Sequence, residues 1–231
     1  MPRLTLALAC ALVLGACSQH FADDRFVTAG DAVRPSVVLL SMRVPPEKKQ
    51  NKYDDEFATG MVVASDTWGS DILTVAHAVD GAWHIVATIG DHTKAPAKVV
   101  AFDKDLDVAL LRTTQRGLTP LPLGSSAGLS KQLGREVALV GYPIPDEFED
   151  EDLGLASSFE TGHLSSMRKH ALEVSLPIVP GESGAPIFLV DNATVIGMAE
   201  SRFDDEHSIG FALPIDDAKS FLHKHDAEHG F

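Results

Sequence analysis

The chain has 231 residues, with 33 acidic side chains against 19 lysines and arginines, and a formal net charge of −14 at pH 7. This acidity argues against a nucleic-acid partner, because binding to phosphates needs clustered Lys and Arg. The length suits one two-layer or two-barrel domain and leaves little room for a second module.

Residues 1–16 have the pattern of a signal peptide. Arg3 precedes an apolar run, Leu4–Val13, and small residues then lead to Cys17. The run is shorter than the roughly 20 residues of a membrane-spanning helix, which disfavours an uncleaved anchor. The segment Leu14–Cys17 resembles the bacterial lipobox, in which the cysteine is acylated and becomes the first mature residue. An ordinary secretory signal cleaved nearby is the alternative.

Lipidation of Cys17 would anchor the mature protein to a membrane of the bacterial cell envelope. Ser18, in the next position, resembles the sorting residue of outer-membrane lipoproteins, so we expect the outer membrane, facing the periplasm. The chain has two cysteines, Cys10 and Cys17. The mature body is therefore expected to fold without disulfides.

Residues 17–30 are mostly polar and are interpreted as a tether. Short apolar segments follow, separated by Gly, Pro, Asn and Asp, which is typical of strands and turns in an all-β barrel or sandwich. The first series of expected strands comprises 37–40, 60–64, 72–76, 84–89, 99–102 and 108–111. We assign residues 31–121 to a first β-barrel.

A second series of expected strands comprises 136–140, 171–176, 186–190, 195–199 and 208–213. Residues 216–228 carry Ala218, Phe221 and Leu222 at helical spacing and predict a helix. We assign residues 122–231 to a second β-barrel plus this helix. The predicted fold class is all-β, with two barrels and a short C-terminal helix.

Three segments carry the groups that catalysis by a serine requires: a hydroxyl, an imidazole, a carboxylate and backbone amides. In the first, an apolar strand runs into His77. It resembles the Thr-Ala-Ala-His signature of chymotrypsin-like proteases, with Thr74, Ala76 and His77 matching and Val75 departing. A histidine after an apolar strand is also common as a packed residue.

The second segment places Asp107 directly before an apolar strand, in the Asp-apolar-Ala-apolar-Leu pattern of the same proteases. Asp103 and Asp105 are competitors, but neither is followed by an uninterrupted strand. Clustered aspartates before a strand are otherwise typical of a solvated turn.

The third segment, Pro180–Phe188, is the most specific and resembles the Gly-x-Ser-Gly-Gly-Pro nucleophile loop, with Ser183 as the nucleophile. Gly181 lets the backbone turn so that its N–H and that of Ser183 point into one oxyanion hole. Gly184 is expected to keep a side chain away from the substrate carbonyl. The order His77, Asp107, Ser183 is that of chymotrypsin-like proteases and differs from those of α/β-hydrolases and subtilisins.

Within this fold the chain resembles the protease domain of the HtrA (DegP-like) family over most of residues 31–222. Four segments outside the triad carry the resemblance: Val33–Val38, Leu121–Ser126, Thr161–Ser165 and Ile209–Pro214. The resemblance implies that one strand runs beside a bound peptide, through Ile209, Gly210, Phe211 and Ala212.

Three residues around the nucleophile depart from the family pattern. Val179 replaces the usual Asn, Glu182 replaces Asp or Asn, and Ala185 replaces the second glycine. We expect no PDZ module after Phe231, so the resemblance is to the catalytic domain of the family.

Two weaker patterns bear on metal binding. His225 and His229 have the i,i+4 spacing that can hold a metal on a helix, and Asp146–Asp152 is an acidic run. Both patterns are more typical of solvated surface. We predict no metal and no cofactor.

The sequence thus predicts a serine endopeptidase that cleaves exported or misfolded polypeptides in the bacterial envelope. The alternatives are a catalytically inactive protease-fold lipoprotein that binds peptides, and a glutamyl endopeptidase of the V8 type, which shares the nucleophile loop.

Overall fold

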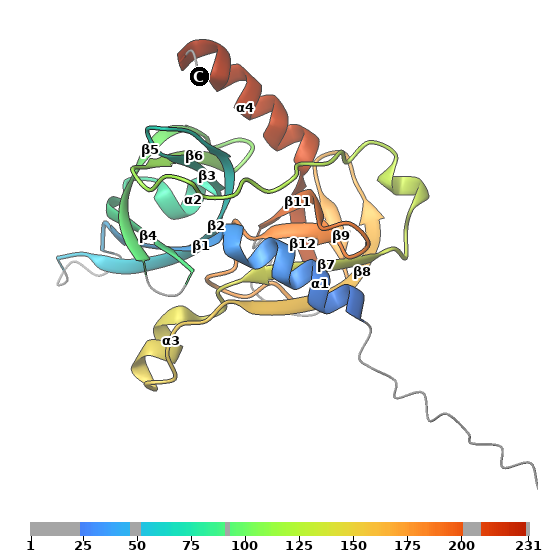
Figure 1. The fold of residues 1–231 in the computed structure, drawn as a ribbon, viewed down its shortest axis with the longest axis horizontal. Coiled ribbons are helices and arrows are strands. Elements are labelled where there is room, and N and C mark those ends of the chain that lie inside the picture. The colour runs from blue at the N-terminus through green and yellow to red at the C-terminus, as the bar shows by residue number, and fades with distance from the viewer. Residues whose placement is uncertain (1–23, 47–51, 91–92, 201–208, 230–231) are drawn as a thin grey trace, which may run out of the picture.

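The computed structural model describes residues 24–46, 52–90, 93–200 and 209–229. The predicted signal peptide, Cys17 and Ser18 lie outside the described residues. The described chain forms two closed antiparallel barrels of six strands each, packed side by side (Figure 1). The predicted all-β, two-barrel fold is confirmed.

The first barrel closes in the order β1-β2-β3-β6-β5-β4. Its strands are β1 (Val37–Val44), β2 (Asp54–Ser65), β3 (Ser70–Thr74), β4 (Trp83–Ile89), β5 (Thr93–Asp103) and β6 (Val108–Thr113). Along β5, buried and exposed residues alternate as the two faces of a half-buried strand require. A single helical turn, α2 (Ala76–Val79), follows β3.

The second barrel closes in the order β10-β11-β12-β9-β8-β7. Its strands are β7 (Glu136–Gly141), β8 (Ser158–Met167), β9 (Leu172–Val174), β10 (Pro186–Leu189), β11 (Thr194–Glu200) and β12 (Gly210–Pro214). The apolar pattern did not indicate β8, because Leu164 is the one fully buried side chain along it. The resemblance of Thr161–Ser165 to a strand of the HtrA family did indicate a strand in this region.

The predicted tether is wrong for residues 24–30, which belong to helix α1 (Asp24–Val33). Ala29, Gly30 and Val33 are buried on one face of this helix. Gly30 lies so close to β8 that an added Cβ would be 3.1 Å from the ring of Phe159. Apolar residues at helical spacing therefore pack α1 onto the second barrel. A 3-10 turn, η1 (Arg34–Ser36), then leads into β1.

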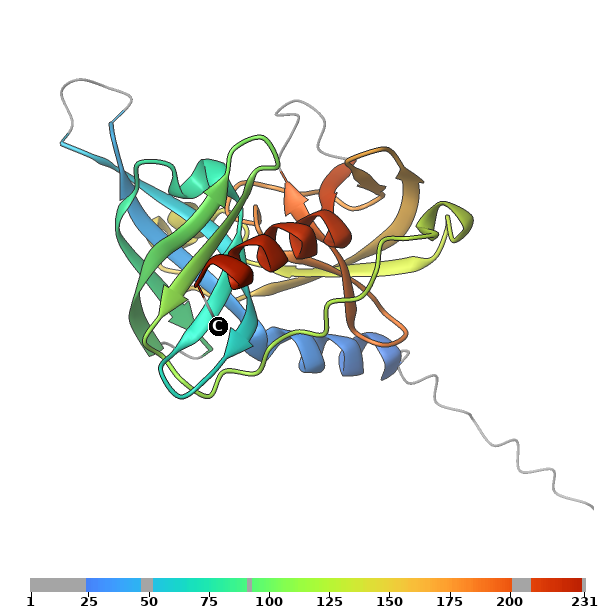
Figure 2. The same ribbon diagram turned by 90° about the horizontal axis from the view of Figure 1, so that it is seen from above.

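Two α-helices and a 3-10 turn, η2 (Leu129–Lys131), complete the described fold. α3 (Pro145–Asp150) overlaps the acidic run Asp146–Asp152. α4 (Ile215–His229) matches the predicted C-terminal helix closely. Its Ile215, Ala218 and Phe221 are buried in a core shared by both barrels. The helix runs from the end of β12 toward the first barrel (Figure 2). None of the helices in the described residues is long and apolar enough to span a membrane.

Candidate active site between the barrels

The pairing of β3 with β6 brings His77 and Asp107 together. The two strands are antiparallel with Thr74 opposite Ala109, so the residues after β3 lie beside those before β6. Asp107 Oδ2 is 2.7 Å from His77 Nδ1, and Asp107 Oδ1 accepts the backbone N–H of His77 at 2.8 Å. Because a carboxylate only accepts hydrogen bonds, Nδ1 carries the hydrogen and Nε2 is left as the basic nitrogen.

Asp107 and His77 each favour the charged form of the other. The hydrogen bond that His77 donates to Asp107 raises the pKa of His77 above its ordinary value against the opposing effect of burial, and the charges of Asp107, Glu56 and Glu200 add to the rise. Burial acts to raise the pKa of Asp107, but its hydrogen bonds and charge interaction with His77, together with the N–H of Ala76, outweigh burial and lower it. Folding therefore favours an ionised Asp107 beside His77.

The competing aspartates have other roles. Asp103 Oδ1 accepts the backbone N–H groups of Asp105 and Leu106, at 3.0 and 3.1 Å, and so closes the turn between β5 and β6. Asp105 is exposed. Of the three aspartates, Asp107 is the one that contacts His77.

The loop that carries Ser183 needs glycine on both sides of it. Gly181 and Gly184 both have a φ of +91°, in a region that residues with a side chain rarely adopt. A Cβ on Gly184 would lie 2.1 Å from Thr59 O and 2.4 Å from Thr74 Oγ1. The expected reason for Gly184, space for the substrate carbonyl, is therefore joined by a second one: this glycine lets the loop approach the first barrel closely.

Thr59 of β2 holds this loop against the first barrel and is fully buried. Its backbone N–H donates to Ser183 O at 2.9 Å, and its hydroxyl donates to Gly181 O at 2.7 Å. The same hydroxyl accepts the N–H of Tyr142 at 3.0 Å, and Thr59 O accepts the hydroxyl of Thr74 at 2.7 Å. The N–H and the hydroxyl of Thr59 thus bind the second barrel, and its carbonyl binds Thr74 within the first.

The backbone around Ser183 leaves two donors available. The N–H of Glu182 donates to Val179 O at 3.1 Å. Within the described residues, the N–H groups of Gly181 and Ser183 have no such acceptor. These are the two donors predicted for the oxyanion hole. The described side chains show no hydrogen bond between Ser183 and His77, and such bonds are often long until a substrate binds.

Ala185, one of the departures from the family pattern, fits without strain. It is fully buried, its φ is not positive, and its N–H and C=O both pair, with Glu182 O and with the N–H of Ala199. A methyl group is therefore accommodated where the family carries glycine.

Of the four predicted substrate-binding residues, Gly210, Phe211 and Ala212 lie in β12 and Ile209 directly precedes it. Phe211 and Ala212 pair with β9 on one side and with β11 on the other, so their backbone has no open edge for a substrate strand. Ala212 is fully buried, whereas 41% of Ile209 is exposed. A substrate could therefore contact this segment through side chains, above all that of Ile209, and not through the paired backbone.

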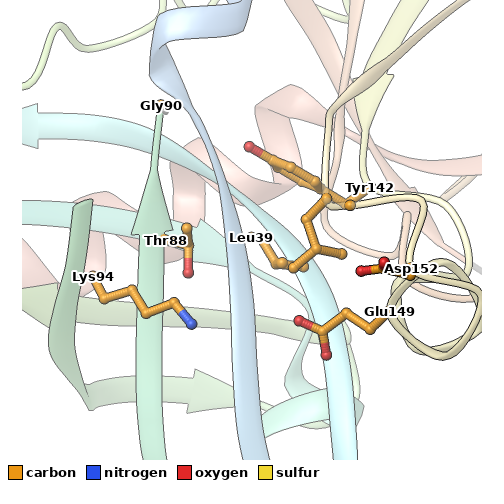
Figure 3. Close-up of a pocket in the computed structure, with 9 residues that line it drawn as sticks. Leu39, Thr88, Gly90, Lys94, Tyr142, Glu149 and Asp152 are labelled. Atoms are coloured by element: carbon orange, nitrogen blue, oxygen red, sulfur yellow. The ribbon is translucent and has the colours of Figure 1, made fainter. Parts of the chain in front are cut away.

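Two cavities lie near the site. One of about 150 Å³ is lined by Ala76, His77, Asp80, Lys104 and Asp107. A larger one, about 420 Å³, lies between the first barrel and the α3 segment, with Lys94 facing Glu149 (Figure 3). The smaller cavity is lined by the predicted base, His77, and by its partner Asp107, but by no residue of the Ser183 loop. Within the described chain, no group of three or more His, Cys, Asp or Glu is arranged to hold a metal ion.

Sequence reasoning missed Thr59 and Glu200. Thr59 stands in a strand like any β-branched residue, and nothing in the local pattern reveals a partner 122 residues away. Glu200 is a buried acid at the end of β11 whose charge acts on His77. The sequence did contain a sign of this residue, because an acidic side chain at the end of an apolar strand is unusual.

We predict that Thr59→Val destabilises the fold, although valine has nearly the same shape. The substitution leaves Gly181 O and the Tyr142 N–H buried without a partner, at about 1–3 kcal/mol for each group. Denaturant unfolding measures the loss. Thr59→Ser should retain most of the stability.

Thr113→Val is the matched control for that prediction. Thr113 is a buried threonine of the same barrel, and its hydroxyl accepts one weak local bond, from Gln115 N–H at 3.4 Å. A Thr59→Val variant as stable as Thr113→Val would show that the hydroxyl contacts contribute little.

Comparisons with known proteins find relatives that are named as proteases. Among curated proteins, the chain is 32% identical to Protease Do-like 1, chloroplastic, of Arabidopsis thaliana over 162 residues, and 29% identical to Serine protease Do-like HtrA of Bacillus subtilis over 171 residues. It is also 29% identical over 210 residues to a protein of Halomonas elongata named "Probable periplasmic serine endoprotease DegP-like". The matches cover 63%, 70% and 86% of this chain, which spans only 34%, 37% and 39% of these relatives.

Two solved structures of the HtrA-type protease AlgW with tripeptide have TM-scores of 0.73 and 0.69, at 21% and 22% identity, and each match covers 89% of this chain and 64% of the other. They support the chymotrypsin-like fold. The sequence profile of the trypsin-like peptidase domain matches residues 58–198, from β2 through β11. Because this match covers more than half of the chain, the protein belongs to the trypsin-like peptidase domain family.

Proposed function

We propose that the protein is a serine endopeptidase that works through an acyl-enzyme on Ser183. The observation that carries the proposal is the two-point contact between Asp107 and His77, at 2.7 and 2.8 Å, on the barrel that also binds the Ser183 loop through Thr59. Membership of the trypsin-like peptidase domain family supports it.

The mechanism follows from the positions of the donors and acceptors. Ser183 Oγ attacks the scissile carbonyl while His77 Nε2 accepts the hydroxyl proton, and Asp107 stabilises the resulting imidazolium. The negative oxygen of the tetrahedral intermediate accepts hydrogen bonds from the N–H groups of Gly181 and Ser183. His77 then gives its proton to the leaving amine, and the C–N bond breaks to leave an ester on Ser183. Water hydrolyses this ester by the same route, with His77 first accepting and then returning a proton.

The proposed substrates are exported or misfolded polypeptides of the bacterial envelope. The relatives include proteins named as serine proteases and three named as probable periplasmic serine endoproteases, which supports polypeptide substrates and an envelope compartment. We further propose that lipidated Cys17 anchors the protein to the outer membrane, on the strength of the lipobox-like Leu14–Cys17 segment.

We predict that Ser183→Ala lowers turnover by roughly 10⁴-fold or more, because the nucleophile is lost. A fluorophosphonate probe should label wild type and not this variant. Ser130→Ala is the control, since Ser130 is exposed and remote in sequence from the loop. A folded wild-type protein that neither reacts with the probe nor cleaves peptides would instead favour the catalytically inactive, peptide-binding alternative.

We expect Asp107→Asn to lower turnover by about 10⁴-fold without unfolding the protein, because the amide holds His77 in the wrong tautomer. Asp107 also raises the pKa of His77. The acid limb of kcat/KM, which reports His77 losing its proton, should therefore lie above the ordinary histidine value in wild type and move to lower pH in the variant. Asp105→Asn is the control, and the assignment fails if that change is the damaging one.

For the anchor, we predict that mass spectrometry of the mature protein finds a diacylglyceryl-modified Cys17 as the first residue. Cys17→Ala should abolish the modification and release the protein from the membrane fraction. An unmodified mature N-terminus downstream of Cys17 would rule out the lipid anchor and leave the secretory-signal alternative.

A further inference from the structure

Glu182, between the oxyanion residue Gly181 and the nucleophile Ser183, closes a tight turn. Its backbone N–H donates to Val179 O at 3.1 Å, and its side-chain Oε2 accepts the N–H of Val179 at 3.0 Å. These reciprocal bonds fix the four residues from Val179 to Glu182. The orientation of the Gly181 N–H therefore depends on where the Glu182 side chain lies.

The environment of this side chain suits a neutral carboxyl better than a charged one. Glu182 is fully buried, and its Oε1 has no hydrogen-bond partner within the described residues. On β7, the uncharged Gly141 lies against its Cγ. On β8, the acidic Glu160 acts on it as a like charge. No described cation offsets the charge, so an ionised Glu182 would have a single N–H donor and a repelling neighbour.

We propose that Glu182 is a proton-dependent positioning residue: its neutral carboxyl holds the Val179–Glu182 turn and so aligns the oxyanion donors, and its ionisation releases the turn. The effect on catalysis rests on the proposed function. A carboxylate that cannot stay buried regains hydration by turning outward, which breaks the bond to Val179. Gly181 and Ser183, its two chain neighbours, then lose their fixed geometry.

The transition falls near neutral pH. Burial raises the pKa of Glu182 to about 7, with the Val179 N–H opposing the rise and Glu160 adding to it. Burial also raises the pKa of Glu160. Activity then needs His77 to have lost its proton and Glu182 to have kept its own, so kcat/KM should follow a bell-shaped pH profile.

The test compares pH profiles of wild type and Glu182→Gln. Glutamine can still accept the Val179 N–H and cannot ionise, so the variant should keep the acid limb and lose the alkaline one. If only the neutral form is active, wild-type kcat/KM should fall about tenfold per pH unit above the transition. Glu160→Gln should move the alkaline limb of wild type to lower pH, because it removes the like charge. Glu136→Gln, at the far end of β7, is the control and should leave the profile unchanged.

Thermal unfolding tests the same proton without using activity. With a pKa raised from 4.5 to about 7 in the folded state, the folded protein binds more protons than the unfolded chain between these values. Wild type should therefore lose stability relative to Glu182→Gln as pH rises from about 4.5 to 7, and the gap should stay constant above. Glu182→Ala lacks the acceptor for Val179 and should be impaired at every pH.

The outcomes separate the two proposals. Parallel pH profiles and parallel melting curves for wild type and Glu182→Gln would overturn the role of Glu182 while leaving the protease intact. A wild type that is inactive at every pH would remove the proposed function, and the melting curves alone would then decide whether Glu182 holds a proton. A diverging melting curve with parallel activity profiles would overturn the positioning role.

Discussion

The geometry of the site depends on one buried residue, Thr59, whose N–H and hydroxyl tie the Ser183 loop of the second barrel to strand β2 of the first. Its N–H and hydroxyl bind the carbonyls of Ser183 and Gly181, and its own carbonyl accepts the hydroxyl of Thr74. Thr74 ends the strand that leads into His77. The proposed base and the proposed nucleophile belong to different barrels. Both are therefore positioned by contacts with the same short stretch of β2. Buried hydrogen bonds of this kind are costly to break, which makes the junction stiff.

The close approach at this junction explains residues that otherwise look like separate requirements. Gly184 must lack a side chain because Thr59 O and Thr74 Oγ1 occupy the position of its Cβ. Gly181 must lack one because Tyr142 O does the same on the other side of the loop. Both glycines also adopt a φ of +91°. The loop is thus clamped between β2 and the end of β7, and the glycines are the price of bringing backbone against backbone.

The fold and the candidate triad could be predicted because each is encoded locally. Apolar strand runs, the strand that ends at His77 and the glycines around Ser183 are all visible within a few residues. α1 could not be predicted, because its buried face is small and needs the ring of Phe159, far along the chain, to cover it. The role of Thr59 could not be predicted for the same reason, because its partners depend on how the barrels dock. The sequence indicated only part of the reason for Gly184, because the carbonyl of Thr59 reaches this glycine only once the two barrels have docked.

The division of the site between the barrels has a consequence for folding. His77 and Asp107 belong to the first barrel and Ser183 to the second, and the contact from Thr59 to Gly181 spans 122 residues of sequence. Contacts of such long range form late, after the loops between them have closed. A chain with only one barrel folded holds either the base or the nucleophile, never the assembled pair. An incompletely folded chain would on this account be chemically silent, and the proposed hydrolysis would begin only once both barrels have folded and docked.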